Sequence, residues 1–255
     1  MRAERLTLRQ QEPLGWLWHA DGMSDLRAAR PRPAVWIPVA LAVVLVVAVV
    51  GVLVRDSAAV NDAELSFLHD LSAMHTSLLT PIALAINIGF GPVGAVIISL
   101  IVAVVIGMSA RAAWPAVRFG LLVAVPWLVV DVIKAVVSRP RPDAGVLVEQ
   151  LIREPASASY PSGHTAFAAA LGVALVWTVV SRTHRAAPVV VAAAVAAVLA
   201  LVTAWSRMYL GVHHPTDVTA SLLVVPVVST AVFAVAERVV PARGPRSVAA
   251  ADDPL

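Results

Sequence analysis

A short polar segment in the last quarter of the chain holds residues whose types and spacing suit phosphate chemistry. It runs from Ser206 to Asp217 (SRMYLGVHHPTD) between two long apolar runs that contain no ionisable residue. Pro215 can begin the second run as a helix, because the N–H that proline lacks is not needed in a first helical turn. His213 then lies at the mouth of that helix, with Asp217 one turn away and within reach of the imidazole.

This spacing predicts a histidine that is oriented by a carboxylate. A carboxylate bonded to one ring nitrogen fixes the tautomer and leaves the other nitrogen free to attack. Arg207 adds a planar, permanent cation that suits phosphate oxygens. Arginine, histidine and aspartate are costly to hold at a membrane boundary, so the segment is interpreted as half of a phosphate-handling site. His214 lacks the four-residue spacing to Asp217 and is assigned no catalytic role.

The composition of the chain indicates that this segment belongs to an integral membrane protein. The 255 residues are 59% hydrophobic and 14% charged, with a mean hydropathy of +0.84, values typical of a polytopic membrane protein. The chain has no cysteine, which excludes disulfides and thiolate metal sites. The formal charge of +3 is explained by where the arginines fall, so no nucleic-acid partner is expected.

The apolar runs predict an all-α fold with six transmembrane helices. The predicted spans are residues 35–54, 92–110, 119–137, 165–181, 186–205 and 218–236. The first begins too far into the chain, and runs too long, for a cleaved signal peptide, so it is interpreted as a retained anchor. A shorter apolar run over 78–90 contains Pro81 and Asn87 and is predicted to be an interfacial or re-entrant helix. One membrane domain over 35–236 thus separates two polar tails, 1–34 and 237–255.

The basic residues predict which face of the membrane each loop occupies. Six spans place both termini on one side, and 13 of the 19 Lys and Arg residues fall in the four segments of that side. By the positive-inside rule this side is cytoplasmic. The long loop 138–163 and the loop 206–215 then lie on the opposite face of the cell membrane. A loop as long as 138–163 is usually functional.

Three polar clusters converge on that outer face, each at the end of a predicted span. Together they resemble the type 2 phosphatidic acid phosphatase superfamily, which also includes the vanadium haloperoxidases. The family pattern is K-x6-R-P, then P-S-G-H, then S-R-x5-H-x3-D. The chain fills it with Lys134, Arg141 and Pro142, with Pro161, Ser162, Gly163 and His164, and with Ser206, Arg207, His213 and Asp217. The resemblance covers about residues 80–236 and implies that family's helical-bundle core.

The resemblance implies a catalytic role for three of these residues. His213 corresponds to a nucleophile that attacks phosphorus and forms a phosphohistidine. Asp217 would hold its ring and stabilise the cation that forms. His164 corresponds to a general acid that protonates the leaving oxygen and later activates water.

Phosphate binding falls to a second group of residues. Lys134, Arg141 and Arg207 would neutralise charge on the phosphoryl oxygens. Ser162 and Gly163 precede a helix, where backbone N–H groups can approach an anion.

The remaining polar residues near the site receive supporting or unrelated roles. Asp131 is expected to pair with Lys134, since the two lie three residues apart on one helix face. Pro142 and Ser206 complete the motifs as supporting residues. Outside the pattern, Arg139 is expected to reach lipid headgroups by snorkelling. No Asp, Glu or His cluster has the spacing of a metal site, so neither a metal nor another cofactor is expected, as in the family.

These observations predict an integral-membrane lipid phosphatase whose partners are the bilayer and a lipid phosphate. Undecaprenyl diphosphate or a similar polyprenyl diphosphate is the favoured substrate, with phosphatidic acid and phosphatidylglycerol phosphate as alternatives. A transporter is disfavoured because the charges gather at one face rather than at mid-membrane. A non-catalytic lipid-binding protein is disfavoured by the complete set of motif residues, and a haloperoxidase by the six spans. The sequence does not indicate an oligomeric state.

Overall fold

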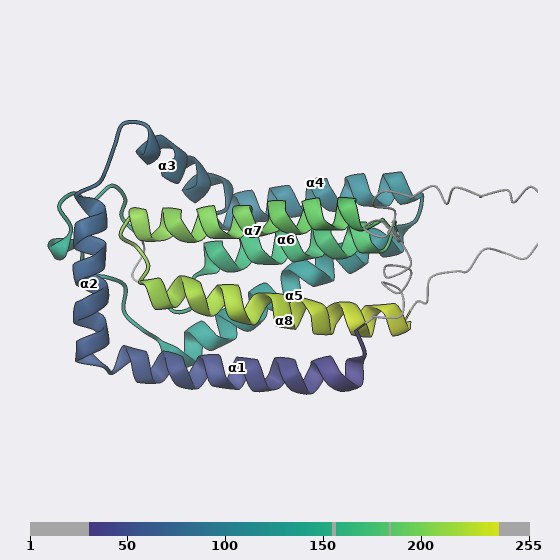
Figure 1. Ribbon diagram of the computed structural model, residues 1–255, viewed down its shortest axis with the longest axis horizontal. Helices are drawn as coiled ribbons and strands as arrows, with labels where there is room; N and C mark the ends of the chain where they lie inside the picture. The colour runs from purple at the N-terminus through teal and green to yellow at the C-terminus, as the bar shows by residue number, and fades with distance from the viewer. Residues whose placement is uncertain (1–30, 155–156, 184, 240–255) are drawn as a thin grey trace, which may run out of the picture. The chain divides into compact units, whose positions relative to one another are not determined.

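The computed structural model describes residues 31–154, 157–183 and 185–239, and in these ranges it contains helices and no strand (Figure 1). The elements are α1 (Pro33–Arg55), α2 (Ala58–Ser72), α3 (Leu79–Gly89), α4 (Pro92–Ala110), α5 (Ala113–Val137), the short 3-10 helix η4 (Ala144–Val146), α6 (Gly163–Val180), α7 (Ala186–Tyr209) and α8 (Pro215–Val239). Six of them, α1 and α4 to α8, are long and apolar enough to cross a membrane. The predicted all-α fold with six spans is therefore confirmed. Residues 1–30 and 240–255 of the two predicted tails lie outside the described residues.

Most of the spanning helices are longer than the apolar runs that predicted them, and α5, α7 and α8 differ most. Helix α5 begins at Ala113 rather than at residue 119, and α7 continues to Tyr209 rather than ending at Trp205. A charged residue ends an apolar run in the sequence, but a helix continues through a charge that finds a partner. Arg118 in α5 is buried against Glu237 of α8, and Arg207 in α7 is likewise paired.

Helix α6 lies at the centre of the bundle and packs against α5, α7 and α8. Its buried face is built largely from small residues, among them Ala166, Ala170 and Gly172. A Cβ added at Gly172 would lie 2.7 Å from the Cβ of Ala196 on α7. Small residues let helix backbones approach closely, which is how helices associate in a membrane that provides little hydrophobic drive. Helices α1 and α4 instead expose many large apolar side chains, as lipid-facing helices do.

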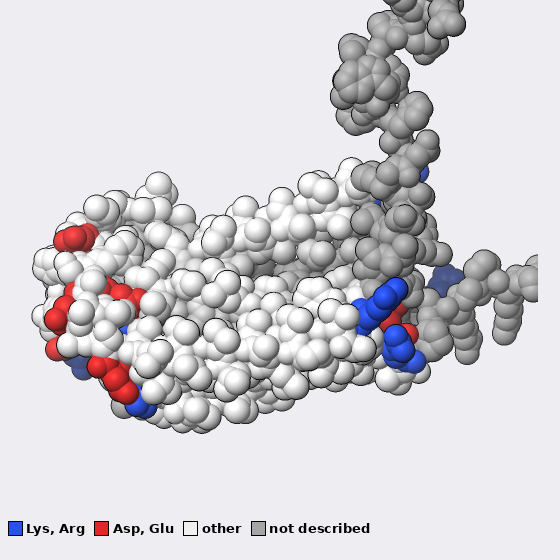
Figure 2. Space-filling model, turned by 60° about the horizontal axis from the view of Figure 1, so that its bottom comes forward, with Lys and Arg blue, Asp and Glu red and all other residues white. Residues whose placement is uncertain are grey.

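Helices α2 and α3 lie at one end of the bundle, where α2 crosses the ends of the spanning helices (Figure 1). Helix α3 has 11 residues, and at about 1.5 Å per residue it is too short to cross a hydrocarbon core of about 30 Å. Tyr209 at the end of α7 holds the link between these two helices, since its hydroxyl accepts a 2.8 Å bond from the Thr76 N–H. Figure 2 shows charged side chains at both ends of the visible face and none in the band between.

Candidate active site

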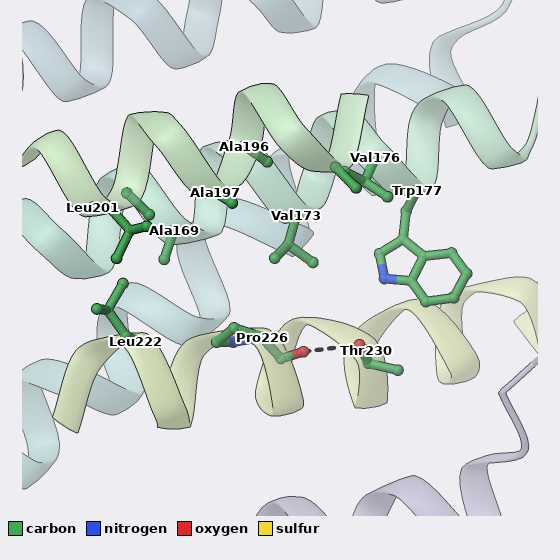
Figure 3. A pocket seen from close by; sticks show the side chains of 12 residues that line it. Ala169, Val173, Val176, Trp177, Ala196, Ala197, Leu201, Leu222, Pro226 and Thr230 are labelled. Atoms are coloured by element: carbon green, nitrogen blue, oxygen red, sulfur yellow. Dashed lines mark hydrogen bonds between the residues drawn. The ribbon is translucent and has the colours of Figure 1, made fainter. Parts of the chain in front are cut away.

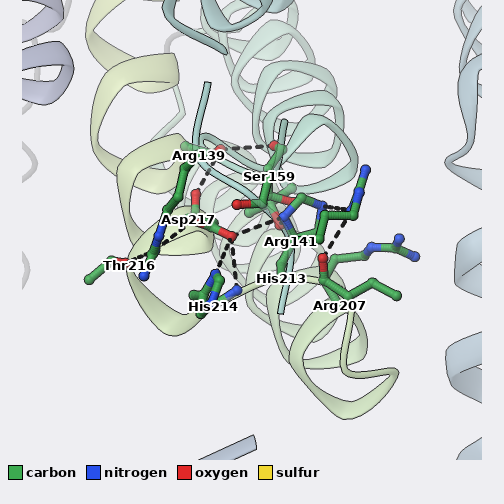
Figure 4. Close-up of polar contacts among 12 residues, drawn as sticks. Arg139, Arg141, Ser159, Arg207, His213, His214, Thr216 and Asp217 are labelled. Atoms are coloured by element: carbon green, nitrogen blue, oxygen red, sulfur yellow. Dashed lines mark hydrogen bonds and ion pairs between the residues drawn. The ribbon is translucent and has the colours of Figure 1, made fainter. Parts of the chain in front are cut away.

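The three motif clusters meet at the end of the bundle that carries α2. Figure 4 shows Arg141 of the first cluster beside His213 and Asp217 of the third. Each side chain comes from the end of a different element. Lys134 lies in the last turn of α5, Arg141 in the following loop, His164 in the first turn of α6, Arg207 in the last turn of α7, and Asp217 in the first turn of α8. His213 stands two residues before α8. Helix ends therefore deliver the residues that the sequence analysis singled out to one place.

His213 lies between a carboxylate and a guanidinium. Its Nδ1 is 3.3 Å from Oδ2 of Asp217, and its Nε2 is 3.3 Å from Nη1 of Arg141. A guanidinium can only donate hydrogen bonds, so Nε2 must be the accepting nitrogen and Nδ1 must carry the proton. The neighbours of His213 thus select one neutral tautomer, with the Nε2 lone pair turned toward Arg141.

Burial keeps His213 in that neutral form. The side chain is 1% exposed, and burial lowers its pKa well below the ordinary value of 6.5, although the hydrogen bond to Asp217 opposes this shift. Desolvation disfavours the charged imidazole, whereas an adjacent carboxylate favours it. The ring is therefore neutral at physiological pH, as the predicted role of nucleophile requires.

His214 makes the same contact with Asp217 that His213 makes. Its Nδ1 also lies 3.3 Å from Oδ2, and its backbone N–H donates to that oxygen at 2.9 Å. The spacing that set His214 aside in the sequence therefore does not separate the two histidines in space. What distinguishes His213 is its second nitrogen, which faces Arg141.

The turn between α7 and α8 that carries both histidines depends on a glycine. Gly211 has a φ of +67°, in the left-handed region that favours glycine. A Cβ at this position would lie 2.3 Å from Cδ1 of Leu147. Both the backbone conformation and the available space therefore require glycine here.

Arg141 and Arg207 share a carboxylate that the sequence analysis did not identify. Nη2 of Arg207 donates to Oε1 of Glu154 at 2.5 Å, and Nη2 of Arg141 lies 3.6 Å from Oε2. Burial raises the pKa of Glu154, but Arg207 and Arg141 outweigh it and lower the pKa overall. The group between the two guanidiniums is therefore an anion. No motif marks Glu154 in the sequence.

Both arginines keep hydrogen-bonding capacity for a further anion. Among the described residues, the buried Nε atoms of Arg141 and Arg207 have no hydrogen-bond partner. Arg207 is fully buried, and its Nη1 donates to Oδ1 of Asn87 on α3 at 2.5 Å. The sequence analysis treated Asn87 only as an interruption of an apolar run.

His164 is held more loosely than His213. Its ring is half-buried, and Nε2 lies 3.1 Å from the backbone carbonyl of Asn87. A carbonyl oxygen only accepts, so Nε2 of His164 carries a proton. Lys134 lies nearby, with Nζ 3.8 Å from where a Cβ on Gly163 would stand. The missing side chain of Gly163 leaves room for the ammonium beside the first turn of α6.

Hydrogen bonds tie the start of α6 to α8 and so fix the two histidines relative to each other. The Ser162 N–H donates to the Asp217 carbonyl at 3.0 Å. The Ser221 hydroxyl in turn donates to the Ser162 carbonyl at 2.8 Å. Ser162 thus precedes the first turn of α6 and, through its backbone, also links that turn to α8.

The supporting residues behave differently from one another. Pro142 and Ser206 are buried, and the Ser206 hydroxyl donates to the Thr203 carbonyl at 2.8 Å. Asp131 is exposed on α5, and within the described ranges it acts on Lys134 through the attraction of opposite charges, without a hydrogen bond between the two. Its supporting role for Lys134 stays a prediction.

Arg139 departs from expectation, because it does not face the lipid. Its side chain is 1% exposed and donates to the carboxylates of Glu64 and Asp217 at 2.7 and 2.9 Å. The expectation of snorkelling rested on its position at a span end and could not reveal the two carboxylates that fold around it. For metals, no group of three or more His, Cys, Asp or Glu in the described part of the chain is arranged to hold an ion.

Comparisons with known proteins relate the chain to one superfamily. Residues 115–241 match the family model of the PAP2 superfamily. "Undecaprenyl-diphosphatase BcrC" of Bacillus subtilis (strain 168) is 34% identical over 95 residues, which are 37% of this chain and 44% of that protein. The match therefore spans less than half the length of that relative.

A solved structure matches over a larger part of the chain. It is the crystal structure of the first transmembrane PAP2 type phosphatidylglycerolphosphate phosphatase from Bacillus subtilis. The TM-score is 0.65 with 21% sequence identity, over 83% of this chain and 99% of that one. At that identity the likeness establishes a shared fold.

Proposed function

The chain belongs to the PAP2 superfamily of membrane phosphatases, and we propose that it hydrolyses a lipid phosphate through a phosphohistidine on His213. The observation that carries this proposal is the position of the His213 ring between Asp217 and Arg141, 3.3 Å from each. The lone pair of Nε2 points to the place where a phosphate held by Arg141 would present its phosphorus. The proposed nucleophile, His213, therefore lies next to Arg141, the residue proposed to bind the phosphate.

In the first step, Nε2 of His213 attacks phosphorus, the N–P bond forms, and the bond from phosphorus to the leaving oxygen breaks. His164, protonated on both ring nitrogens when the phosphate anion is bound beside it, donates its Nε2 proton to that oxygen and becomes neutral. The leaving oxygen takes the accepting position now held by the Asn87 carbonyl. Asp217 stabilises the positive charge that develops on the His213 ring. Arg141, Arg207 and Lys134 hold the other phosphoryl oxygens.

In the second step, a water molecule attacks the phosphorus of the phosphohistidine. His164, now neutral and without a proton on Nε2, accepts a proton from the water at that nitrogen. The N–P bond breaks and its electron pair returns to Nε2 of His213, which releases inorganic phosphate.

Before either step, a phosphate that binds both arginines must take the place of the Glu154 carboxylate.

The surroundings of the site support a lipid as the substrate. Farther along the same helices, α6, α7 and α8 line a partly open cavity of about 510 Å³ with apolar side chains such as Val173, Trp177 and Leu222 (Figure 3). Its one hydroxyl, on Thr230, already donates to the Pro226 carbonyl at 2.8 Å. The lining therefore suits hydrocarbon, since its side chains are apolar apart from the Thr230 hydroxyl and the indole N–H of Trp177.

Among lipid phosphates, we favour a polyprenyl diphosphate such as undecaprenyl diphosphate, because the relative with 34% identity is named for that activity. Phosphatidylglycerol phosphate, named for the structural neighbour, and phosphatidic acid are the alternatives. The test is phosphate release by the purified protein in detergent with each lipid. Vanadate should inhibit release as a phosphate analogue, and a chelator should leave it unchanged, since the proposed chemistry needs no metal. Loss of phosphate release in the presence of the chelator would overturn the proposal that the reaction needs no metal.

We also propose that the site faces the outside of the cell and that both termini are cytoplasmic, because 13 of 19 basic residues fall on the opposite side of the predicted spans. The chain has no cysteine, so single cysteines can report this directly. Val148→Cys, at an exposed position in the loop after α5, should react with a membrane-impermeant thiol reagent in intact cells. Ser181→Cys, at the other end of α6, should react only after lysis. The reverse labelling would overturn the proposed orientation.

A further inference from the structure

The carboxylate that orients His213 is itself held by a buried arginine. Asp217 divides its two oxygens between different partners (Figure 4). Oδ2 faces the imidazole of His213 at 3.3 Å, whereas Oδ1 accepts from Nη1 of Arg139 at 2.9 Å. The guanidinium therefore fixes the rotation of the carboxylate and with it the direction of Oδ2 toward the His213 ring.

Arg139 connects this carboxylate to a second one on α2. Its Nη2 donates to Oε2 of Glu64 at 2.7 Å and to Oδ1 of Asn61, one turn earlier on the same helix, at 2.5 Å. Glu64 is 7% exposed. Buried charges of this kind persist only where each is paired. His213, Asp217, Arg139 and Glu64 thus form one continuous buried chain.

Glu64 also binds the first turn of α8 directly. Its Oε1 accepts from the Thr216 N–H at 2.7 Å, and its Oε2 accepts from the Thr216 hydroxyl at 3.1 Å. The first N–H groups of a helix have no partner within the helix, so a carboxylate from elsewhere can satisfy one of them. Helix α2 therefore contacts the start of α8 in two ways. Glu64 accepts hydrogen bonds from Thr216, and Glu64 is also linked to Asp217 through the charge of Arg139.

The charges of the four residues in this buried row suit the proposed chemistry. When His213 attacks phosphorus its ring becomes cationic, and a neighbouring negative charge stabilises it. Asp217 paired with Arg139 alone would be neutral in sum. Glu64 adds a second carboxylate to the same guanidinium, which leaves one net negative charge beside the ring.

We propose that Arg139 and Glu64 are positioning residues that extend the pair of His213 and Asp217 into a buried chain anchored on α2. Arg139 fixes the direction of the Asp217 carboxylate, and Glu64 balances the arginine charge so that the chain can stabilise the cationic ring. This inference rests on the proposed function of His213. Neither residue belongs to the sequence motifs of the site.

The test is a double-mutant cycle measured on the preferred lipid phosphate. Arg139→Gln should lower kcat by about 10- to 100-fold, the usual effect of removing a partner that orients a functional group. KM should change less than about threefold, because Arg139 does not touch the phosphate. In an Asp217→Asn background the same substitution should cost less than about threefold more, since residues that act as one unit are not additive.

Variants of the same contacts separate positioning from folding. Arg139→Lys keeps the charge but lacks the planar fork, so it should recover part of the lost kcat. Glu64→Gln keeps an oxygen for the Thr216 N–H but removes the charge, and it should also lower kcat without raising KM. Arg153→Gln, at an exposed position in the same loop, is the control and should stay within about twofold of the unmodified protein. Where Arg139→Gln fails to fold, Arg139→Lys and Glu64→Gln carry the test.

A full loss from Arg139→Gln in the Asp217→Asn background, or a rise in KM with kcat unchanged, would overturn the inference. A second readout does not need turnover. With ¹⁵N-labelled histidine, the His213 signals, assigned by their loss in His213→Gln, should report the Nδ1–H tautomer in the unmodified protein and a mixture in Arg139→Gln. If the unmodified protein releases no phosphate from any lipid, the proposed function fails. An unchanged tautomer in Arg139→Gln would show instead that the positioning inference fails.

Discussion

The two histidines of the site stand at the starts of adjacent helices but are supported in opposite ways. His213 is fully enclosed, with Asp217 on one ring nitrogen and Arg141 on the other. His164 is half-buried, and among the described residues its ring makes a hydrogen bond to a backbone carbonyl on α3. A nucleophile needs one tautomer and one direction, whereas an acid that serves two different oxygens in turn needs room to adjust.

The supports also differ in what they are attached to. One partner of His213, Asp217, belongs to the first turn of α8 and is linked to α2 through Arg139 and Glu64. The partner of His164 belongs to α3, a short helix that packs mainly against α7. The contrast indicates that substitutions around His213 alter the chemical step, whereas those around His164 alter how particular substrates are handled.

The largest effect is expected from His213→Ala, which removes the proposed nucleophile. Turnover should be abolished, and rapid quench should no longer trap an acid-labile, base-stable phosphoenzyme. The matched control is His214→Ala, which removes an imidazole at the same 3.3 Å from Asp217. It should stay within about tenfold of the unmodified protein, or about 1.4 kcal/mol of barrier. An inactive His214→Ala with an active His213→Ala would exchange the two assignments.

Asp217→Asn should have the next largest effect. The amide can favour the wrong tautomer of His213, and a comparable substitution in a catalytic triad costs about 10,000-fold in kcat. The double variant with His213→Ala should be little worse than His213→Ala alone, because the two residues act together. Steady-state kinetics on the four proteins measure this, and additive losses would mean that Asp217 has a separate role.

His164→Ala should lose activity in proportion to how much the leaving group needs a proton. On a lipid phosphate the loss should be about 100- to 10,000-fold, the usual range for general acid catalysis. On an ester of nitrophenol, whose anion leaves without help, the loss should be much smaller. Equal losses on both substrates would assign His164 to phosphate binding or to the second step.

Asn87→Ala should have a smaller effect that separates the two contacts of this residue. It removes the side-chain oxygen that binds Arg207 but keeps the main-chain carbonyl that contacts His164. KM for the lipid phosphate should rise by up to about tenfold, the effect of one weakened charge-assisted hydrogen bond. The ratio of rates on lipid and nitrophenyl substrates should not change, and a changed ratio would place the side chain in the acid step.

The smallest effect is expected from acidification, because the pKa of His213 is held well below 6.5 by burial. A group with a lowered pKa stays neutral as the pH falls past its ordinary value. An exposed histidine would lose about tenfold of its neutral form by pH 5.5, whereas His213 should lose very little. The measurement is kcat/KM between pH 7.5 and 5.5, corrected for the second ionisation of the substrate phosphate near pH 6. A corrected tenfold fall would mean that His213 has its ordinary pKa.

The lowered pKa of His213 also predicts how its contribution to the stability of the protein changes with pH. Between the folded and unfolded pKa values of His213 the unfolded chain binds more protons, so acidification below about 6.5 favours unfolding. Above that pH the contribution of His213 to stability is fully present.

Much of this protein is predictable from its sequence because the signals are local. A span needs only a run of apolar residues, and the six runs were enough for the six helices. The motifs likewise state which side chains stand at helix ends, as with His213 four residues before Asp217. The sequence was weaker wherever a contact joins distant segments. It did not identify Glu64, Asn87 or Glu154, which lie outside the motifs.

By itself, then, the sequence determined the membrane-spanning fold and the motif residues that meet at one end of it. Only the tertiary structure decided how these residues are held. Arg139 illustrates the reason, since the same side chain at a span end can reach lipid headgroups or turn inward. The choice depends on whether Glu64 and Asp217, 75 and 78 residues away, fold around it to repay its desolvation. Periodicity and spacing describe neighbours along one element, whereas a buried charge is stabilised by partners from several elements.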